Sequence, residues 1–596
     1  MSNLARQPLQ IVEIDIDYCT RSYGAAPCTA SLSSSNPRKC FNTFSTCQDT
    51  GHFNKGTLTL RFAKNIAGLP KGQTIFPALQ SVSTNPTKIT LGAVDDRTGS
   101  LGKRARVTVR LQDFTYGDAL TDKYAAERLS GGAQHSAVGY DPAEFGTFFG
   151  KLRARYPYYF GRALRVKNGY VGDDIATMDT DHYLITEWKG PGASGSVEFT
   201  AQDPLKLADK EFALCPKPTT GKIPADVTDV STPTFDVIPA GIGSDYATSG
   251  QITIGTEIAK FTRVGDTFTI TERGVGGSIA EAHSAGDTLQ QCYVVDDEYP
   301  EAVVADLLEN FAEIPAAWID ETVWATEVRR WAANLRFNRV VTNPTPVVQL
   351  LGQIMDMGFV IWSDSRNQKI KMRANRPVDV DEEAPSITDT SHILSGTINR
   401  SDLDEQRLTQ VWSVHGMINY AESQSDADNY RVVEVVTDLS AEGDDQYGQK
   451  KVHIIYMPWL GVVGSATHAA IIAARMLTRY EATPQEVTFA ADIKDKADLG
   501  IGNLITVTSR VLQDVTGANS PAGMQVTTVD EVDPGNRLSV TAQSYQFDGR
   551  WGWLHDTGYT TDYDAAATSE IADGCFMIDD GVSSTFPDGT SPYIMF

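Results

Sequence analysis

The stretch Arg106-Val107-Thr108-Val109-Arg110-Leu111 sets the pattern for most of this chain. Apolar side chains alternate with polar or charged ones, and a period of two places every second residue on the same face of a β-strand. The same alternation occurs in 195–200 and 538–542, and clusters of Gly, Asn, Asp and Pro separate such runs. The sequence therefore predicts a mainly β protein of the α+β class.

Three stretches have helical spacing of their apolar residues instead, and we expect each to turn that face toward a core. The first begins after Pro300 and ends before Pro315. The second has Thr345 as its N-cap, with Pro346 at the first helical position, and ends near Gly358; the third begins after Thr467 and stops before Pro484.

A chain of 596 residues is long enough for several domains. Our expected division is a cysteine-rich segment at 1–55, a first β-barrel-like domain at 56–215 with 292–300, a small inserted β-module at 216–291, a helix-containing α/β domain at 301–385, a second β-domain at 386–545 with a helix at 468–481, and an acidic, partner-docking C-terminal segment at 546–596. An insertion leaves and re-enters its parent fold at one place, so Cys215 and Cys292 are expected to lie close together.

The formal net charge is −25, and it is uneven: residues 1–110 carry +8 and the remainder −33. Such a polyanion repels phosphates, which makes it a poor candidate for gripping DNA but leaves open a protein that surrounds passing DNA. From Asp548 onward there are nine acids and one base, Arg550, yet the chain ends in Tyr593-Ile594-Met595-Phe596. This segment is either a solvated acidic tail or, given its large apolar groups, a docking segment.

Neither a membrane-spanning stretch nor a secretory signal is evident, so we expect folding in a cytosol with reduced thiols. The H-E-x-x-H, G-x-S-x-G and P-loop signatures of common enzymes are absent. Gly274 to Gly277 are interpreted as tight turns rather than a phosphate site, and His283 as a packing or surface residue. Acidic pairs are too common among 76 acids to indicate a hydrolase.

Four of the seven cysteines fall within 29 residues: Cys19, Cys28, Cys40 and Cys47. The Gly-, Ser- and Pro-rich sequence between them has too few apolar residues to build a core, so a cross-link is expected. The options are disulfides, a structural zinc or an iron–sulfur cluster; free thiols also remain open, and a metal centre is favoured in a reducing compartment. His52 is a possible substitute ligand.

The C-x8-C and C-x6-C pairs, with Tyr23-Gly24 and Lys39 between the first and third cysteines, resemble the cysteine region of the lambda tail-tip protein and its relatives in long-tailed phages. In that family the four cysteines hold a [4Fe-4S] cluster, which implies metal and cofactor ligation by Cys19, Cys28, Cys40 and Cys47. Here the cysteines open the chain, whereas in the lambda protein they lie near its end, and the loop between the pairs is shorter.

Two further runs resemble tail hub proteins: 252–289 is similar to a small β-module of phage tails, and 469–508 to a helix-plus-barrel unit. The resemblance implies a non-enzymatic hub of a phage tail tip or baseplate. Such hubs are homotrimers with two tube-like barrels per chain that join the tail tube, tape-measure, fibre and other tail-tip proteins, while DNA passes through unbound. It also implies a virion tail-tip location, assembly in the host cytoplasm and no stable membrane insertion. The alternatives are a tail-associated cell-wall hydrolase and an iron–sulfur redox protein.

Overall fold

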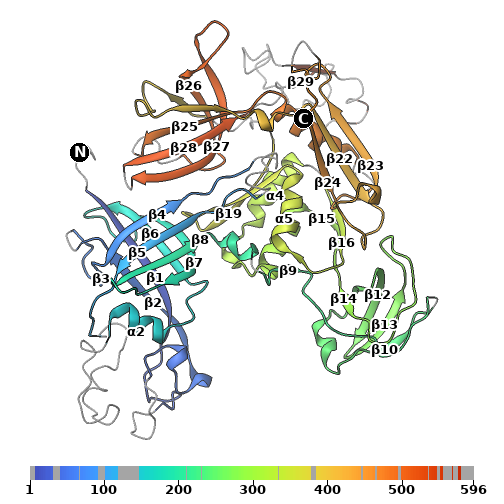
Figure 1. Ribbon diagram of the computed structural model, residues 1–596, viewed down its shortest axis with the longest axis horizontal. Helices are drawn as coiled ribbons and strands as arrows, with labels where there is room; N and C mark the ends of the chain where they lie inside the picture. Colours follow the sequence, from blue (N-terminus) through green and yellow to red (C-terminus); the bar gives the residue numbers. More distant parts are fainter. Residues whose placement is uncertain are drawn as a thin grey trace.

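The computed structural model has a mainly β fold with a helical centre, which confirms the expected fold class (Figure 1). The structure describes residues 7–30, 40–65, 68–90, 101–117, 146–209, 211–229, 231–332, 335–376, 384–443, 447–462, 466–493, 499–533, 536–545, 551–554, 567, 569 and 575–578. Over these ranges, the helices all lack the length or apolar character needed to cross a membrane.

The first sheet has eight strands in the order β3-β2-β1-β6-β7-β8-β5-β4. Alternation in β5 behaves as predicted: Val107, Val109 and Leu111 are fully buried, whereas Arg106 and Arg110 are exposed. The strands are β1 (Pro8–Cys19), β2 (Lys55–Ala63), β3 (Ile75–Phe76), β4 (Leu79–Asn85), β5 (Arg106–Gln112), β6 (Ala163–Tyr170), β7 (Asp179–Lys189) and β8 (Ser196–Gln202).

This sheet curls on itself like a barrel. Its two outermost strands, β3 and β4, are consecutive in the chain and only Pro77 and Ala78 separate them. Three Cα steps span at most about 11 Å, so the two edges must lie near each other. The enclosed side chains form one apolar cluster, into which the helix α2 (Phe148–Arg155) inserts Phe148 and Phe149.

The first boundary differs from the expected one. Strand β1 lies inside the eight-stranded sheet, paired with both β2 and β6, so residues 1–55 do not form a separate segment. The alternating Val12, Ile14 and Ile16 place β1 in the barrel core. The cysteine-bearing part is therefore the connection between β1 and β2, residues 20–54, which we call the cysteine loop.

Residues 216–291 form a compact unit with its own core, here called the module. Its five-stranded sheet contains β10 (Thr234–Asp236), β13 (Thr267–Glu272), β12 (Glu257–Val264), β11 (Ser249–Ile254) and β14 (Leu289–Gln291), in that order. Its two ends meet: Gln290 donates from its side chain to the Lys217 carbonyl at 3.0 Å. Burial raises the pKa of Tyr293, and Cys215 contributes to that shift, so Cys215 lies near the residue that follows Cys292.

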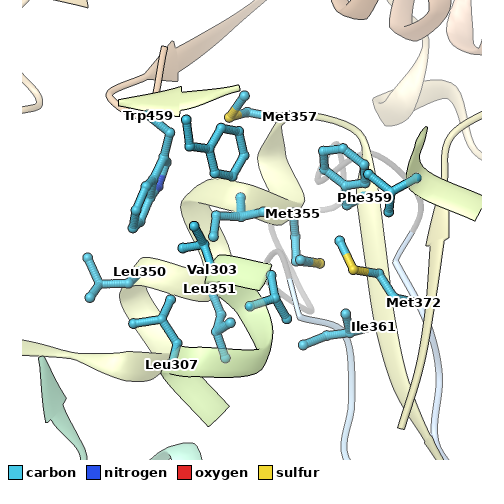
Figure 2. Close-up of a cluster of buried hydrophobic side chains, with 14 of the residues drawn as sticks. Val303, Leu307, Leu350, Leu351, Met355, Met357, Phe359, Ile361, Met372 and Trp459 are labelled. Carbon is cyan, nitrogen blue, oxygen red and sulfur yellow. The ribbon is translucent and has the colours of Figure 1, made fainter. Parts of the chain in front are cut away.

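The centre of the molecule is a helical core that the module interrupts (Figure 2). Val303, Leu351, Met355 and Trp459 meet there. The elements are α3 (Pro300–Asp306) with a π-turn at Leu307–Phe311, α4 (Glu321–Trp331), α5 (Val347–Asp356) and α6 (Ala466–Tyr480); the paired strands β9 (Leu214–Cys215) and β17 (Thr345–Pro346), β15 (Tyr293–Glu298) and β16 (Phe337–Val341), β18 (Phe359–Asp364) and β19 (Lys369–Ala374); and the sheet of β23 (Tyr430–Thr437), β22 (Gln410–Met417) and β24 (Val452–Met457).

Three expectations change at this core. Residues 292–300 belong to it rather than to the first sheet, because β15 pairs with β16. Thr345 does not cap α5, since it pairs with Cys215 and Pro346 is the N-cap. The expected helix at 468–481 is α6, but its apolar face packs here and not on the second barrel.

The second barrel-like sheet has the order β20-β26-β27-β28-β25-β21. Its strands are β20 (Ser386–Thr388), β21 (Asn399–Asp402), β25 (Gln485–Asp492), β26 (Leu504–Gln513), β27 (Asn519–Asp533) and β28 (Arg537–Ser544). Here too the outermost strands, β20 and β21, are consecutive in the chain. The segment between them crosses the open side, where Leu394 donates its N–H to the Ala490 carbonyl and Ile393 is buried in the core.

The two sheets touch directly, because Thr84 of β4 donates to Asp530 of β27 at 2.9 Å, and the segment after β4 adds further contacts. Ile89 donates its N–H to the Thr527 carbonyl at 3.1 Å, and Lys88 pairs with Glu486 at 2.6 Å. A cavity of about 730 Å³ lies between the sheets and the β18–β19 hairpin. The predicted docking segment 546–596 lies mostly outside the described residues, apart from the paired strands β29 (Trp551–Leu554) and β30 (Cys575–Ile578).

Candidate functional site

All four predicted ligands lie in described residues of the cysteine loop or at its start. Cys19 ends β1 and Cys47 follows a short 3₁₀ turn at Phe44–Thr46, whereas Cys28 and Cys40 lie outside regular elements. Cys19 and Cys40 are buried, and Cys28 and Cys47 are half-buried. None of these four cysteines forms a disulfide, so disulfides do not hold the described part of the loop.

Backbone pairing brings Cys19 and Cys40 to the same place. Cys19 donates its N–H to the Asn42 carbonyl at 2.7 Å, and the Asn42 side chain donates back to the Cys19 carbonyl at 3.3 Å. Asn42 adopts a left-handed backbone, φ 61°, which lets its own N–H donate to the Cys40 Sγ at 3.4 Å. An N–H donor to sulfur stabilises a thiolate and is a feature of iron–sulfur sites.

A carboxylate joins the other two cysteine positions. Asp49 Oδ2 accepts from both the N–H and the hydroxyl of Thr29, each at 2.8 Å, which ties the residue after Cys28 to the residue two beyond Cys47. These two bonds are the main reason that the pKa of Asp49 falls to about 2. His52 Nδ1 lies 3.0 Å from Asp49, so in this structure His52 supports the carboxylate rather than acting as a fifth donor.

The thiols also interact electrostatically. Burial raises the pKa of Cys47, and the neighbouring Cys19 and Cys28 raise it further, because three thiolates close together repel one another. A bound cation would remove that repulsion. However, no group of three or more Cys, His, Asp or Glu side chains in the described ranges has a geometry that would hold a metal ion. The donor chemistry thus suits a thiophilic metal, while these side chains do not form a closed ligand set.

The loop rests on the first barrel rather than on a core of its own. The Arg155 guanidinium lies 3.9 Å from the centre of the Phe41 ring, and Ser45 donates to the Arg155 carbonyl. Phe44 and Phe53 make an edge-to-face pair at 5.3 Å. The end of α2 therefore supports one side of the loop, a contact that sequence reasoning missed because it joins residues more than 100 positions apart.

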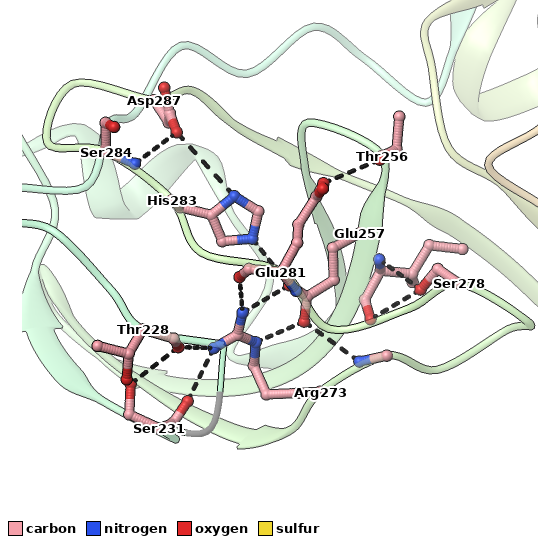
Figure 3. A network of polar contacts seen from close by, with 12 residues as sticks. Thr228, Ser231, Thr256, Glu257, Arg273, Ser278, Glu281, His283, Ser284 and Asp287 are labelled. Atoms are coloured by element: carbon pink, nitrogen blue, oxygen red, sulfur yellow. Dashed lines mark hydrogen bonds and ion pairs between the residues drawn. The ribbon is translucent and has the colours of Figure 1, made fainter.

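The module contains a buried carboxylate with several hydrogen-bond donors (Figure 3). Glu257 is fully buried and its carboxylate accepts from Arg273, from His283 at 2.8 Å and from the N–H of Glu281 at 3.1 Å. Burial raises the pKa of Glu257, but these hydrogen bonds outweigh it and the net shift is downward. With its oxygens so fully bonded, Glu257 holds the loop that follows β13 and is not placed to act on a substrate.

The Gly-rich run after Arg273 forms turns, and it also contacts the helical core. Gly274 and Gly277 have positive φ. A Cβ on Gly277 would lie 1.8 Å from the Ile418 carbonyl, and Tyr420 donates its N–H to the Gly276 carbonyl at 3.1 Å. His283 is buried, not a surface residue, and its ring hydrogen-bonds the Glu257 carboxylate.

Comparisons with known proteins identify neither a matching family model nor a matching curated protein. Among solved structures, the chain is similar to the 43 kDa tail protein of prophage MuSo2 from Shewanella oneidensis, with 9% identity, coverage of 78% of this chain and 95% of that one, and a TM-score of 0.34. A tail protein from Neisseria meningitidis MC58 gives 10% identity, coverage of 65% and 85%, and a TM-score of 0.34.

The E. coli c3393 protein gives 10% identity, coverage of 88% and 98%, and a TM-score of 0.31. It is described as a type VI secretion component with structural similarity to the T4 bacteriophage tail proteins gp27 and gp5. At these identities and scores the similarity by itself assigns no function to this chain.

Proposed function

We propose that this chain is the structural hub of a phage tail tip or baseplate, in which three copies form a ring around the DNA path. It joins the tail tube to tape-measure, fibre and other tail-tip proteins and has no catalytic role. The proposal starts from the residues that resemble hub proteins: the cysteine pattern, the stretch that forms the module, and the 469–508 run.

The observation that carries the proposal is the pair of curled sheets. Each has outermost strands that are consecutive in the chain, β3 with β4 and β20 with β21. The two sheets touch through the side chains of Thr84 and Asp530. Three chains with two such units each supply six similar units, which is the number that a pseudo-sixfold ring on a tail axis needs. A closed ring also covers strand edges that a single chain leaves exposed.

The charge distribution suits a passage for DNA. Several basic side chains among the first 110 residues face acidic partners of the same chain, as Arg61 does with Glu13 at 2.8 Å and Arg110 with Glu198 at 3.1 Å. Cations held in this way are less able to retain phosphates, and the rest of the chain carries the net negative charge.

We propose a structural [4Fe-4S] cluster, with zinc as the alternative, held by Cys19, Cys28, Cys40 and Cys47. Support comes from four cysteines that form no disulfide, from the hydrogen bonds that hold their neighbouring residues together in pairs, from the repulsion that Cys19 and Cys28 exert on Cys47, and from the N–H donor to Cys40. Binding requires the thiols to rotate toward a common centre. The cluster would cross-link a loop without a core of its own and would supply no turnover chemistry.

The ring is tested by native mass spectrometry of the purified chain and by a map of the tail tip. A mass of three chains and a ring with an acidic channel wall are expected. A stable monomer inside the tail, or a wall lined mainly by Lys and Arg, contradicts the hub.

The metal is tested by purification without oxygen, followed by a visible spectrum and by iron, sulfide and zinc counts. About four irons and four sulfides per chain support the cluster, and one zinc supports the alternative. If neither iron nor zinc is present in stoichiometric amount, the metal centre is contradicted. The ring proposal is tested separately and is not affected by that result.

A further inference from the structure

The sheet β23-β22-β24 has two different faces. One face packs on the helical core: Val411, Ile455 and Met457 are buried there, and α6 lies against β22 and β23. Because side chains alternate along a strand, the residues between them point the other way. We call this second side the outer face; its strands lie at the edge of the molecule in Figure 1.

The two edge strands expose apolar side chains on the outer face, whereas Val414 of the middle strand is buried there. Val433 and Val435 on β23 are each 50% exposed, and Val452 and Ile454 on β24 are 40% and 44% exposed. Trp412 on β22 pairs in register with Val435 on one side and Ile454 on the other, so these side chains form one continuous patch. Single exposed apolar residues are ordinary, but a patch across three strands indicates a surface that is covered in use.

The last strand of the second barrel ends near the start of β22. The Gln543 side chain, near the end of β28, donates to Gln406 at 2.7 Å, and Gln406 lies four residues before β22 begins. Strand β29 follows β28 after a short connection, and β30 pairs with it, Ile578 opposite Trp551. The eighteen residues that follow Ile578 can extend about 60 Å, which is more than twice the length of an eight-residue strand.

The composition of 579–596 suits this surface. It begins with Asp579-Asp580, contains Phe586 and ends in Tyr593-Ile594-Met595-Phe596. The rim of the patch carries charges of both signs: Arg431 on β23 and Lys450 before β24 are exposed, Asp438 follows β23, and Glu442 accepts from Gln410 of β22 at 2.7 Å. The apolar end therefore matches the apolar patch.

We propose that residues 579–596 pack against the outer face of β23-β22-β24 in the same chain. This inference does not depend on the hub assignment, because it rests on the patch, the exit point of the chain and the composition of its end.

The first experiment compares the full chain with a chain that ends at Ile578, by hydrogen exchange of β23 and β24 and by binding of a dye specific for apolar surfaces. Faster exchange in both strands and increased dye binding are expected after truncation. Unchanged exchange and dye binding overturn the proposal. Loss of self-association on truncation of a chain that is otherwise oligomeric would place the segment on a second copy and also overturn it.

The second experiment adds a synthetic 579–596 peptide to the truncated chain. The peptide should bind and restore slow exchange, and a Val433→Asp/Val435→Asp variant should weaken binding about tenfold or more, because two carboxylates would interrupt the apolar patch. Val515→Asp is the control, since Val515 is fully exposed on a turn far from this sheet. Binding that is unaffected by the double variant, or absent in the truncated wild type, contradicts the proposal without relying on the folding of the variant.

Discussion

The cysteine loop and the module are both excursions from the body of the protein, yet different forces hold them. The module encloses Phe261, Phe268 and Ile252, all almost fully buried, and adds a bonded carboxylate at Glu257. In the described part of the cysteine loop, the buried side chains are small or polar, such as Ala30, Asn42 and Thr43, beside the cysteines. A hydrophobic core thus fixes one excursion, whereas the other depends on support from α2 and, as we propose, on a metal.

The largest effect is expected from Cys28→Ser. With one of four ligands missing, the loop should lose its metal entirely and become protease-sensitive between β1 and β2, because metal binding and local folding are coupled. Iron and sulfide counts with limited proteolysis measure this. Cys292→Ser, which lies outside the loop, should retain the metal; equal metal content in both variants would show that Cys28 is not a ligand.

The second effect concerns the module core. Phe268→Ala should lower the free energy of unfolding of the module by about 3–5 kcal/mol, because it leaves a cavity where a fully buried ring packed. Chemical denaturation followed by hydrogen exchange measures the change. Val264→Ala, at an 85% exposed position of the same sheet, should leave stability unchanged. A change in metal content with Phe268→Ala would contradict the independence of the two excursions.

The third effect tests the buried charge. Glu257→Gln should destabilise the module by about 2–4 kcal/mol, since Arg273 would remain buried beside an uncharged partner. Because the fold lowers the pKa of Glu257, its stabilisation is present above its ordinary value of 4.5 and is lost as the pH falls through the lower folded value. The wild type should therefore lose module stability in acid, and Glu257→Gln should flatten that loss.

The control for this variant is Glu272→Gln, at a 56% exposed partner of Lys260. It should change stability by about 0.5 kcal/mol or less. Unfolding midpoints measured between about pH 3 and 7, the range in which carboxyl groups titrate, distinguish the two variants. Identical pH profiles for Glu257→Gln and the wild type would contradict the role given to Glu257.

The smallest effect is expected at Asp181, which lines the cavity between the two barrels and belongs to neither the cysteine loop nor the module. Burial raises the pKa of Asp181, although a hydrogen bond from Ser365 opposes the shift. A raised carboxyl pKa means that stability is present at low pH and is lost as the pH rises through the folded value. Asp181→Asn should therefore stabilise the protein at pH 7 by about 1 kcal/mol or less, with no gain in acid. Thermal unfolding at both pH values measures it; destabilisation at pH 7 would contradict the sign.

Local periodicity predicted the mainly β character and the helices α3, α5 and α6, because alternation and helical spacing are properties of neighbouring residues; it did not predict α2 and α4. The density of cysteines likewise marked the loop that needs support. Pairing partners were decided only in the tertiary structure. Strand β1 lies in the middle of a barrel because distant strands on both sides bury its face, and α6 packs on the helical core because that is where Met476 and Tyr480 find apolar partners. The supports of the cysteine loop and the bonded state of Glu257 join residues far apart in sequence, so no local pattern could reveal them.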